Sequence, residues 1–145
     1  MADDEMNVGL LMFIAHRSME QRTFDALVEA GYGDITIAQG RLAAQIGPDG
    51  TRLTELAERA QVTKQTAGFL VDQLERAGYV ERVPDPTDGR ARLVRLSERG
   101  RRMAELGNGV SAGIEREWAA HLGERRTAQL REALSRLREI TDPYA

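Results

Sequence analysis

Apolar side chains recur at helical spacing through most of this chain. The stretch 6–30 has such a face and runs into Gly31, the kind of residue at which helices commonly end. A second helix is predicted to start at Thr36, because a threonine followed three residues later by Gln39 forms a capping box, in which each side chain satisfies a backbone amide. Its apolar face continues to Ile46, after which a Gly-Pro-Asp-Gly sequence breaks the helix.

Two closely spaced helices and a hairpin follow along the chain. A short helix is predicted at 54–60, a turn at 61–63, and a longer helix from its cap Thr63 to about residue 77. The predicted buried face of the longer helix has apolar residues at helical spacing, namely Ala67, Leu70, Val71 and Leu74. The period then changes toward two, which predicts strands at 79–83 and 91–96 joined by an extended tip with two prolines and an Asp-Gly pair. This order of elements is typical of a winged helix-turn-helix.

Helical spacing resumes after Ser97, which can cap a further helix, and continues almost to the end with an interruption at Gly123. The apolar stripe of this region comprises Met103, Leu106, Val110, Ile114, Trp118, Leu122, Leu130, Leu134, Leu137 and Ile140. A last long helix has little core to cover in so small a domain, so we expect the stripe to contact a second copy of the chain. Packing within one chain is the alternative.

The predicted fold class is mainly α with a small antiparallel β-hairpin, arranged as a winged helix-turn-helix domain plus N- and C-terminal helical dimerisation regions. Residues 1–145 form a single chain, in which the winged part occupies 36–96 and the helical dimerisation part occupies 6–31 and 97–142. A length of 145 residues, of which 41% are hydrophobic and 30% charged, suits one folded domain with a helical extension.

Composition excludes several classes of protein. No apolar run approaches the roughly 20 residues that a membrane-spanning helix needs, and the acidic start MADDEMNV lacks the basic region of a secretory signal. The absence of cysteine excludes disulfides and thiolate metal sites, and the two histidines have no ligand-like spacing, so no metal site or cofactor is expected. We therefore expect a cytoplasmic protein with no membrane partner.

Charge is distributed unevenly along the chain. The net charge of −3 argues against indiscriminate nucleic-acid binding, yet residues 63–102 carry nine basic and six acidic groups. Six arginines fall within 90–102 against the single acid Glu98. A solvated surface is the alternative interpretation of this positive segment.

The second helix of a helix-turn-helix pair is the one presented to the major groove of DNA. Its predicted outward face consists of Thr63, Lys64, Gln65, Thr66, Phe69 and Gln73. Glutamine can pair with adenine, threonine with a base edge or methyl group, and an apolar side chain with the thymine methyl group, while Lys64 suits a phosphate. An ordinary amphipathic helix with a polar outer face is the alternative, and Phe69 then requires another helix of the protein as its partner.

The tip of the hairpin carries a second candidate DNA contact. Arg90 follows Gly89, and an arginine on a thin wing can enter the minor groove, where negative potential is concentrated. Asp88 is placed to orient its guanidinium, and Arg82, Arg92 and Arg95 suit phosphate contacts. The alternative is a surface hairpin with ion pairs that contribute little.

The run DPTDGRARLVRLSERG, residues 85–100, resembles the wing of MarR-type regulators, which typically read D-x-x-D-x-R-x-x-x-V-x-L-T-x-x-G. The runs 53–57 and 74–82 are also similar to that family, and the resemblance extends over nearly the whole chain. It implies a homodimer with interlocking terminal helices that reads a DNA palindrome, with contacts from residues 63–66, Arg90 in the minor groove and Asp88 as its partner. The chain departs from the pattern at Ser97, where threonine is usual, and at Phe69, where many members have a polar or basic residue.

The same resemblance implies an effector, since MarR-type proteins often bind a small aromatic acid between the dimer helices and the winged domain. The candidate residues are His16 and Arg17, because an arginine in an apolar stretch can pair with a carboxylate. A satisfied histidine and a surface arginine are the alternative interpretation of this pair.

The predicted function is a dimeric, sequence-specific transcription regulator that represses a palindromic operator, with double-stranded DNA as its partner. A winged-helix module that binds another protein is the alternative. No nucleophile–base set, phosphate-binding glycine loop or metal cluster is visible in the sequence, so an enzyme with catalytic residues is not expected.

Overall fold

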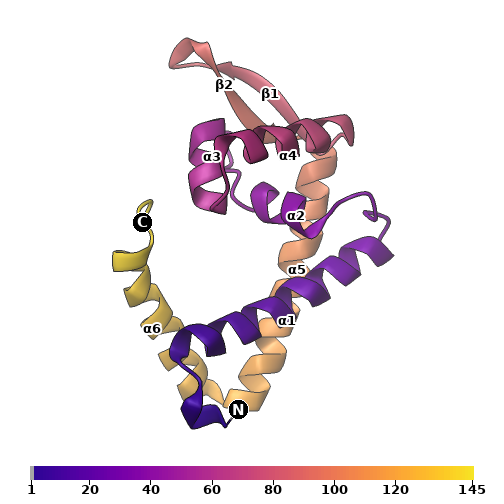
Figure 1. Ribbon diagram of the computed structural model, residues 1–145. Helices are drawn as coiled ribbons and strands as arrows, with labels where there is room; N and C mark the ends of the chain where they lie inside the picture. Colours follow the sequence, from indigo (N-terminus) through magenta and orange to yellow (C-terminus); the bar gives the residue numbers. More distant parts are fainter. Residues whose placement is uncertain (1) are drawn as a thin grey trace. The chain divides into compact units, whose positions relative to one another are not determined.

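The computed structural model describes residues 2–145 and confirms a mainly α fold with one antiparallel hairpin. In chain order, its elements are the short 3-10 helix η1 (Asp3–Glu5), α1 (Val8–Glu29), α2 (Ile37–Ala43), α3 (Leu53–Ala60), α4 (Lys64–Arg76), β1 (Val80–Asp85), β2 (Asp88–Leu96), α5 (Glu98–Leu122) and α6 (Glu124–Thr141) (Figure 1). The described chain divides into two compact units, with the boundary inside α5 between Asn108 and Gly109.

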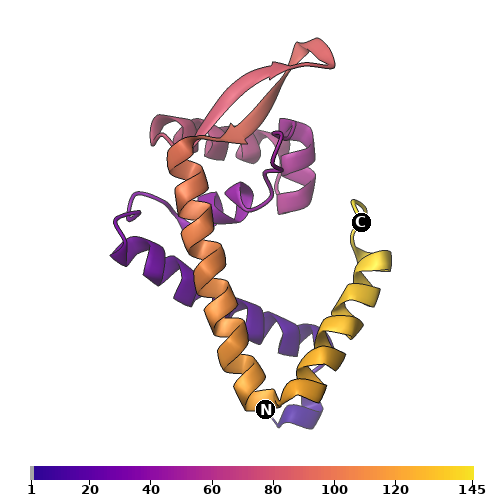
Figure 2. The ribbon, with the colours of Figure 1, turned by 180° about the vertical axis from the view of Figure 1, so that it is seen from behind.

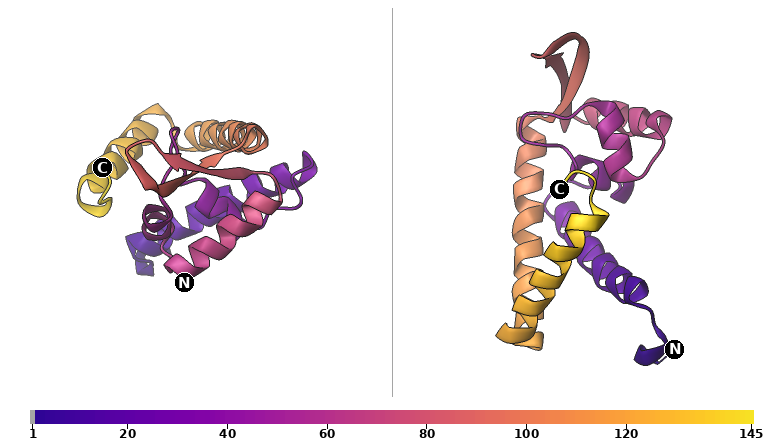
Figure 3. Two further views of the ribbon diagram at one scale, coloured as in Figure 1. Left: turned by 90° about the horizontal axis from the view of Figure 1, so that it is seen from above. Right: turned by 90° about the vertical axis from the view of Figure 1, so that its left-hand side faces the viewer.

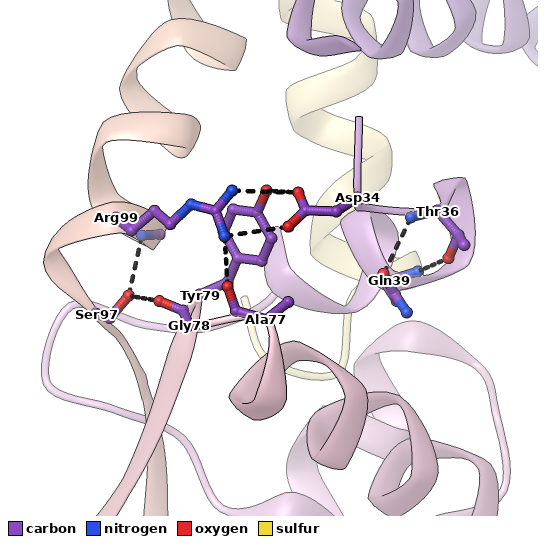
Figure 4. A network of polar contacts seen from close by, with 9 residues as sticks. Asp34, Thr36, Gln39, Ala77, Gly78, Tyr79, Ser97 and Arg99 are labelled. Atoms are coloured by element: carbon purple, nitrogen blue, oxygen red, sulfur yellow. Dashed lines mark hydrogen bonds and ion pairs between the residues drawn. The ribbon is translucent and has the colours of Figure 1, made fainter. Parts of the chain in front are cut away.

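Side-chain caps determine where the first two helices begin. The Asn7 side chain accepts a hydrogen bond from the Leu10 amide at 2.8 Å, so α1 starts two residues later than the apolar pattern predicts. The predicted capping box of α2 is confirmed: the Gln39 amide donates to Thr36 Oγ1 at 3.1 Å, and the Thr36 amide donates to Gln39 Oε1 at 3.0 Å. Both contacts appear in Figure 4.

The core of the first unit lies among α2, α3 and α4. Leu42 and Leu56 are fully buried, and the four predicted core residues of α4, Ala67, Leu70, Val71 and Leu74, are all buried. Between α3 and α4 the backbone reverses at Gln61, which adopts a left-handed conformation with φ of 55°. Thr63 then caps α4 as predicted by accepting a hydrogen bond from the Thr66 amide at 3.1 Å.

The hairpin is longer and tighter than the sequence predicts. Its ladder extends through Pro84 opposite Arg92 to Asp85 opposite Asp88, so the prediction of an extended tip over 84–90 was wrong. Proline is tolerated because β1 is an edge strand, where a missing amide need not interrupt the ladder. On the other side of β2, Thr51 exchanges two backbone hydrogen bonds of 2.9 Å with Val94. In the right-hand view of Figure 3 the tip of the hairpin projects beyond the helices of the winged region, while β1 contacts α4 and β2 contacts α3.

The chain passes directly from β2 into α5, as Figure 2 shows. Ser97 caps α5 by accepting a hydrogen bond from the Gly100 amide at 3.1 Å, in agreement with its predicted role. A Cβ atom at position 100 would lie 2.1 Å from the carbonyl oxygen of Tyr79, so this close approach requires glycine.

A polar network joins the start of α5 to the end of α4 (Figure 4). The Arg99 guanidinium lies 4.2 Å from the centre of the fully buried Tyr79 ring, donates to the Ala77 carbonyl and pairs with Asp34 at 3.2 Å. The Tyr79 hydroxyl donates to Asp34, and this bond lowers the pKa of the Asp34 carboxyl. Burial, together with Asp34, raises the pKa of Tyr79.

The second unit contains the end of α5 and all of α6, and the chain turns between them at Gly123, where φ is 87°. A groove of about 210 Å³ lies between the two helical segments and is lined by Trp118, Leu122, Leu130 and Leu134 together with four polar residues. No residue of α6 is buried. Within the part of the chain that the structure describes, no helix combines the length and apolar character needed to cross a membrane.

Candidate nucleic-acid interface

The N-terminal end of α4 presents the four polar residues that the sequence assigned to DNA contact. Thr63, Lys64, Gln65 and Thr66 are all exposed. The Thr63 hydroxyl accepts from the Thr66 amide and donates to Thr66 Oγ1 at 3.0 Å, so it is committed to capping the helix. The Lys64, Gln65 and Thr66 side chains therefore form the surface that a ligand would meet at this helix end. The helix dipole adds partial positive charge there.

Further along α4 the outward face changes character. Phe69 is 58% exposed. Gln73 is half-buried, and its side-chain oxygen accepts a hydrogen bond of 2.9 Å from Gln39 Nε2, so it faces α2. This corrects the prediction that Gln73 belongs to the outward face, which therefore ends near Phe69.

Arg82 links the hairpin to α4. Its guanidinium lies 2.7 Å from an Asp72 carboxylate oxygen and 2.9 Å from one of Glu75, and only 22% of its side chain is exposed. The sequence assigned Arg82 to a phosphate, whereas in the structure its charge is engaged by two carboxylates of α4. Those carboxylates would otherwise repel a DNA backbone, so the pairing with Arg82 reduces the negative charge of the surface beside Phe69.

A buried carboxylate next to the turn holds the distal end of the hairpin. Asp85 accepts hydrogen bonds from Arg52 Nε and Nη2 at 2.9 and 2.7 Å, and from the Thr87 amide and hydroxyl at 2.8 and 2.7 Å. The Thr87 bonds and the Arg52 guanidinium lower the pKa of Asp85 to about 2. Sequence reasoning missed Arg52, whose only local signal is its position immediately before α3.

At the tip, Asp88 acts on the backbone. Its Oδ1 accepts a hydrogen bond of 3.0 Å from the Arg90 amide, and its Oδ2 lies 3.8 Å from Arg52 Nη2. The sequence paired Asp88 with the Arg90 guanidinium, and the contact that the structure shows is to the Arg90 main chain instead. Arg90 and Arg92 are both exposed, so the tip presents two guanidinium groups.

Residues 33–91, from the loop before α2 into β2, match the model of the MarR family. The winged helix-turn-helix region of this chain belongs to the MarR family. The family resemblance predicted from the run 85–100 is thereby confirmed.

Known proteins extend this match beyond the winged region. The chain is 30% identical over 107 residues to the exopolysaccharide II synthesis transcriptional activator ExpG of Rhizobium meliloti, an alignment that covers 69% of this chain and 55% of ExpG. It thus spans about half the length of that relative. Its fold is similar to that of apo MarR from E. coli, with a TM-score of 0.71 and 23% identity over 91% of this chain and 97% of MarR. It is also similar to S. aureus MepR in a complex with DNA, with a TM-score of 0.66 and 24% identity over 92% of this chain and 97% of MepR.

The two candidate effector residues lie on exposed surface of α1. His16 Nε2 is 3.6 Å from a Glu20 carboxylate oxygen, and Glu20 is bound by Arg41 through contacts of 2.7 and 2.6 Å, which lower the pKa of Glu20. The Arg17 guanidinium lies 5.8 Å from the centre of the Phe13 ring. The structure therefore gives both residues partners on or next to α1.

Replacing Asp85 with asparagine is expected to destabilise the MarR-family wing in a pH-dependent way. The native pKa of about 2 lies below the ordinary value of 3.8, so the ionised carboxylate stabilises the fold above pH 3.8 and this contribution is lost as the pH falls through about 2. Urea denaturation should show Asp85→Asn less stable than the wild type at pH 7, with the difference shrinking between pH 4 and pH 2.

Asp49→Asn, which removes an exposed carboxylate near Thr51, serves as the matched control and should leave stability almost unchanged. A difference between Asp85→Asn and wild type that stays constant down to pH 2 would contradict the role of the Asp85 charge.

Proposed function

We propose that this protein is a transcription regulator that binds double-stranded DNA with α4 in the major groove and the hairpin against the minor groove. The observation that carries the proposal is the division of α4 into a fully packed face and an exposed polar end, beside a hairpin tip with two exposed arginines. Helix α4 has 13 residues and spans roughly 20 Å. A helix enters a major groove about 12 Å wide with its first turns foremost.

Electrostatics favours the same orientation. The positive helix end and Lys64 attract phosphate groups at one side of the groove. Arg90 and Arg92 lie at the tip of a two-stranded ribbon thin enough to approach the minor groove, where Arg90 would be inserted. The similarity to S. aureus MepR in its complex with DNA supports this role for the shared fold.

The proposed regulator acts as a homodimer. Helix α1 exposes Val8, Leu11, Met12, Phe13 and Val28, and α6 exposes Leu130, Leu134, Leu137 and Ile140. So much exposed apolar surface is unusual for a monomer and suits a contact with a second copy. Two-fold symmetry would then place two α4 helices on the halves of a palindromic site.

Regulation itself has two proposed features. A dimer bound over a promoter blocks transcription, and a small aromatic acid bound near His16 and Arg17 would release it. The relative ExpG is named an activator, so the direction of control is part of what must be measured. Such a regulator works where bacterial DNA lies, in the cytoplasm.

Arg90→Ala should weaken binding to a selected DNA site by about tenfold or more, and should make the salt dependence of binding shallower because fewer counterions are released. Fluorescence anisotropy across a salt series measures both quantities. Arg125→Ala, which removes an exposed arginine on the face of α6 opposite Leu134, is the control and should retain wild-type affinity. Unchanged affinity of Arg90→Ala for every DNA tested would favour a protein-binding module instead.

Leu134→Glu should convert the dimer to a monomer, because a carboxylate would be buried in the apolar contact that α6 makes with its partner. Sedimentation velocity reads the assembly state directly. Arg125→Glu introduces the same side chain on the opposite face of α6 and should leave the dimer intact. A wild-type monomer at high protein concentration would refute the proposed dimer.

An aromatic acid that acts as effector should raise the melting temperature of the protein and lower its affinity for DNA in the same concentration range. Thermal-shift screening with and without DNA identifies such a ligand, and a promoter fusion then shows whether it relieves repression. Arg17→Ala should lose the response. A broad panel with no effect on melting or on DNA affinity would refute the effector.

A further inference from the structure

Phe69 is the one large hydrophobic side chain that is exposed within residues 36–96, all of which the structure describes. The other exposed large apolar residues lie on α1, α5 and α6. Ala67, two residues before it, and Leu70, the residue after it, are buried in the core, so the backbone directs position 69 outward. More than half of this side chain is exposed to water, so a partner from outside the unit would bury apolar surface that the fold leaves open.

The surroundings of Phe69 suit a nucleic acid. Gln65 and Thr66, one turn before it, are exposed and polar. One turn after it, Gln73 is turned toward α2, and Asp72 is bound by Arg82 at 2.7 Å. The ring thus lies at the end of a polar surface. The nearest carboxylate, that of Asp72, is paired with Arg82, and this pairing reduces its repulsion of DNA phosphates.

The major groove offers one apolar group to such a ring. The edges of guanine, cytosine and adenine present hydrogen-bonding atoms, while thymine adds a C5 methyl group to its acceptor. A phenyl ring set against a purely polar edge would leave donors or acceptors without partners, whereas contact with a methyl group buries apolar surface on both sides.

We propose that Phe69 is a specificity-determining residue that recognises the 5-methyl group of a thymine in each half of the DNA site. This inference rests on the proposed function, because it requires α4 to lie in the major groove. It assigns the base preference at one position of the site to an apolar contact instead of a hydrogen bond.

The test uses deoxyuridine, which differs from thymidine only by lacking that methyl group. Bound sequences are first selected from random duplexes with the full chain, and symmetry-related pairs of thymines are then replaced by deoxyuridine, one pair at a time. At one pair, the affinity of the wild type should fall by about fourfold per methyl group, the factor that corresponds to burial of one such group. Phe69→Ala should bind the unmodified site more weakly and show no further loss on this replacement.

Two variants and one stability measurement control the experiment. Phe69→Leu keeps an apolar side chain and should keep the methyl dependence. Gln65→Ala should lower the affinity for DNA and should also keep the methyl dependence. Thermal unfolding of Phe69→Ala should match that of the wild type, since the ring is largely exposed.

Three results would overturn the inference. One is a wild type that is insensitive to deoxyuridine at every thymine, and another is Phe69→Ala with undiminished methyl dependence. In either case salt-dependent DNA binding by the wild type would leave the proposed function standing. The third, no DNA binding by the wild type under any condition, would refute the function and the inference together.

Discussion

The packing of one face of α4 is the constraint on which the rest of the winged region depends. Four side chains, Ala67, Leu70, Val71 and Leu74, are buried against α2 and α3, and burial of each of the larger ones contributes about 2 kcal/mol. The opposite side of α4 lies outside this core, so residues 64–66 and Phe69 are exposed. The surface that we assign to DNA is a consequence of the core.

The hairpin depends on a different interaction. Two short strands alone are marginally stable in water, and here β2 is also paired with Thr51 while Asp85 is held by Arg52 at the start of α3. The same cluster reaches Asp88, whose carboxylate holds the Arg90 amide. The tip is therefore built on a carboxylate–guanidinium pair, which allows Arg90 and Arg92 to be presented from a defined backbone.

Five arginines of this region divide into two groups by their partners. Arg52, Arg82 and Arg99 bind carboxylates or a ring of their own unit and thereby join the hairpin, α4 and α5. Arg90 and Arg92 remain exposed at the tip. The arginines of such a segment therefore have two different roles. Some attach the wing to its domain, and others are exposed at the tip, where they can attract DNA.

The sequence by itself determined the elements whose signals are local. Helical spacing, the Thr36–Gln39 capping box, the Thr63 and Ser97 caps and the wing motif all depend on neighbours within a few residues, and the structure has the capping box and both caps at the predicted residues. Only the tertiary structure decided the length of the hairpin, the inward turn of Gln73 and the partners of Arg82 and Asp88. Arg52 and Asp85 are 33 residues apart, and no local pattern can encode which distant carboxylate a guanidinium will meet. That choice is made when the core brings α3 and the hairpin together.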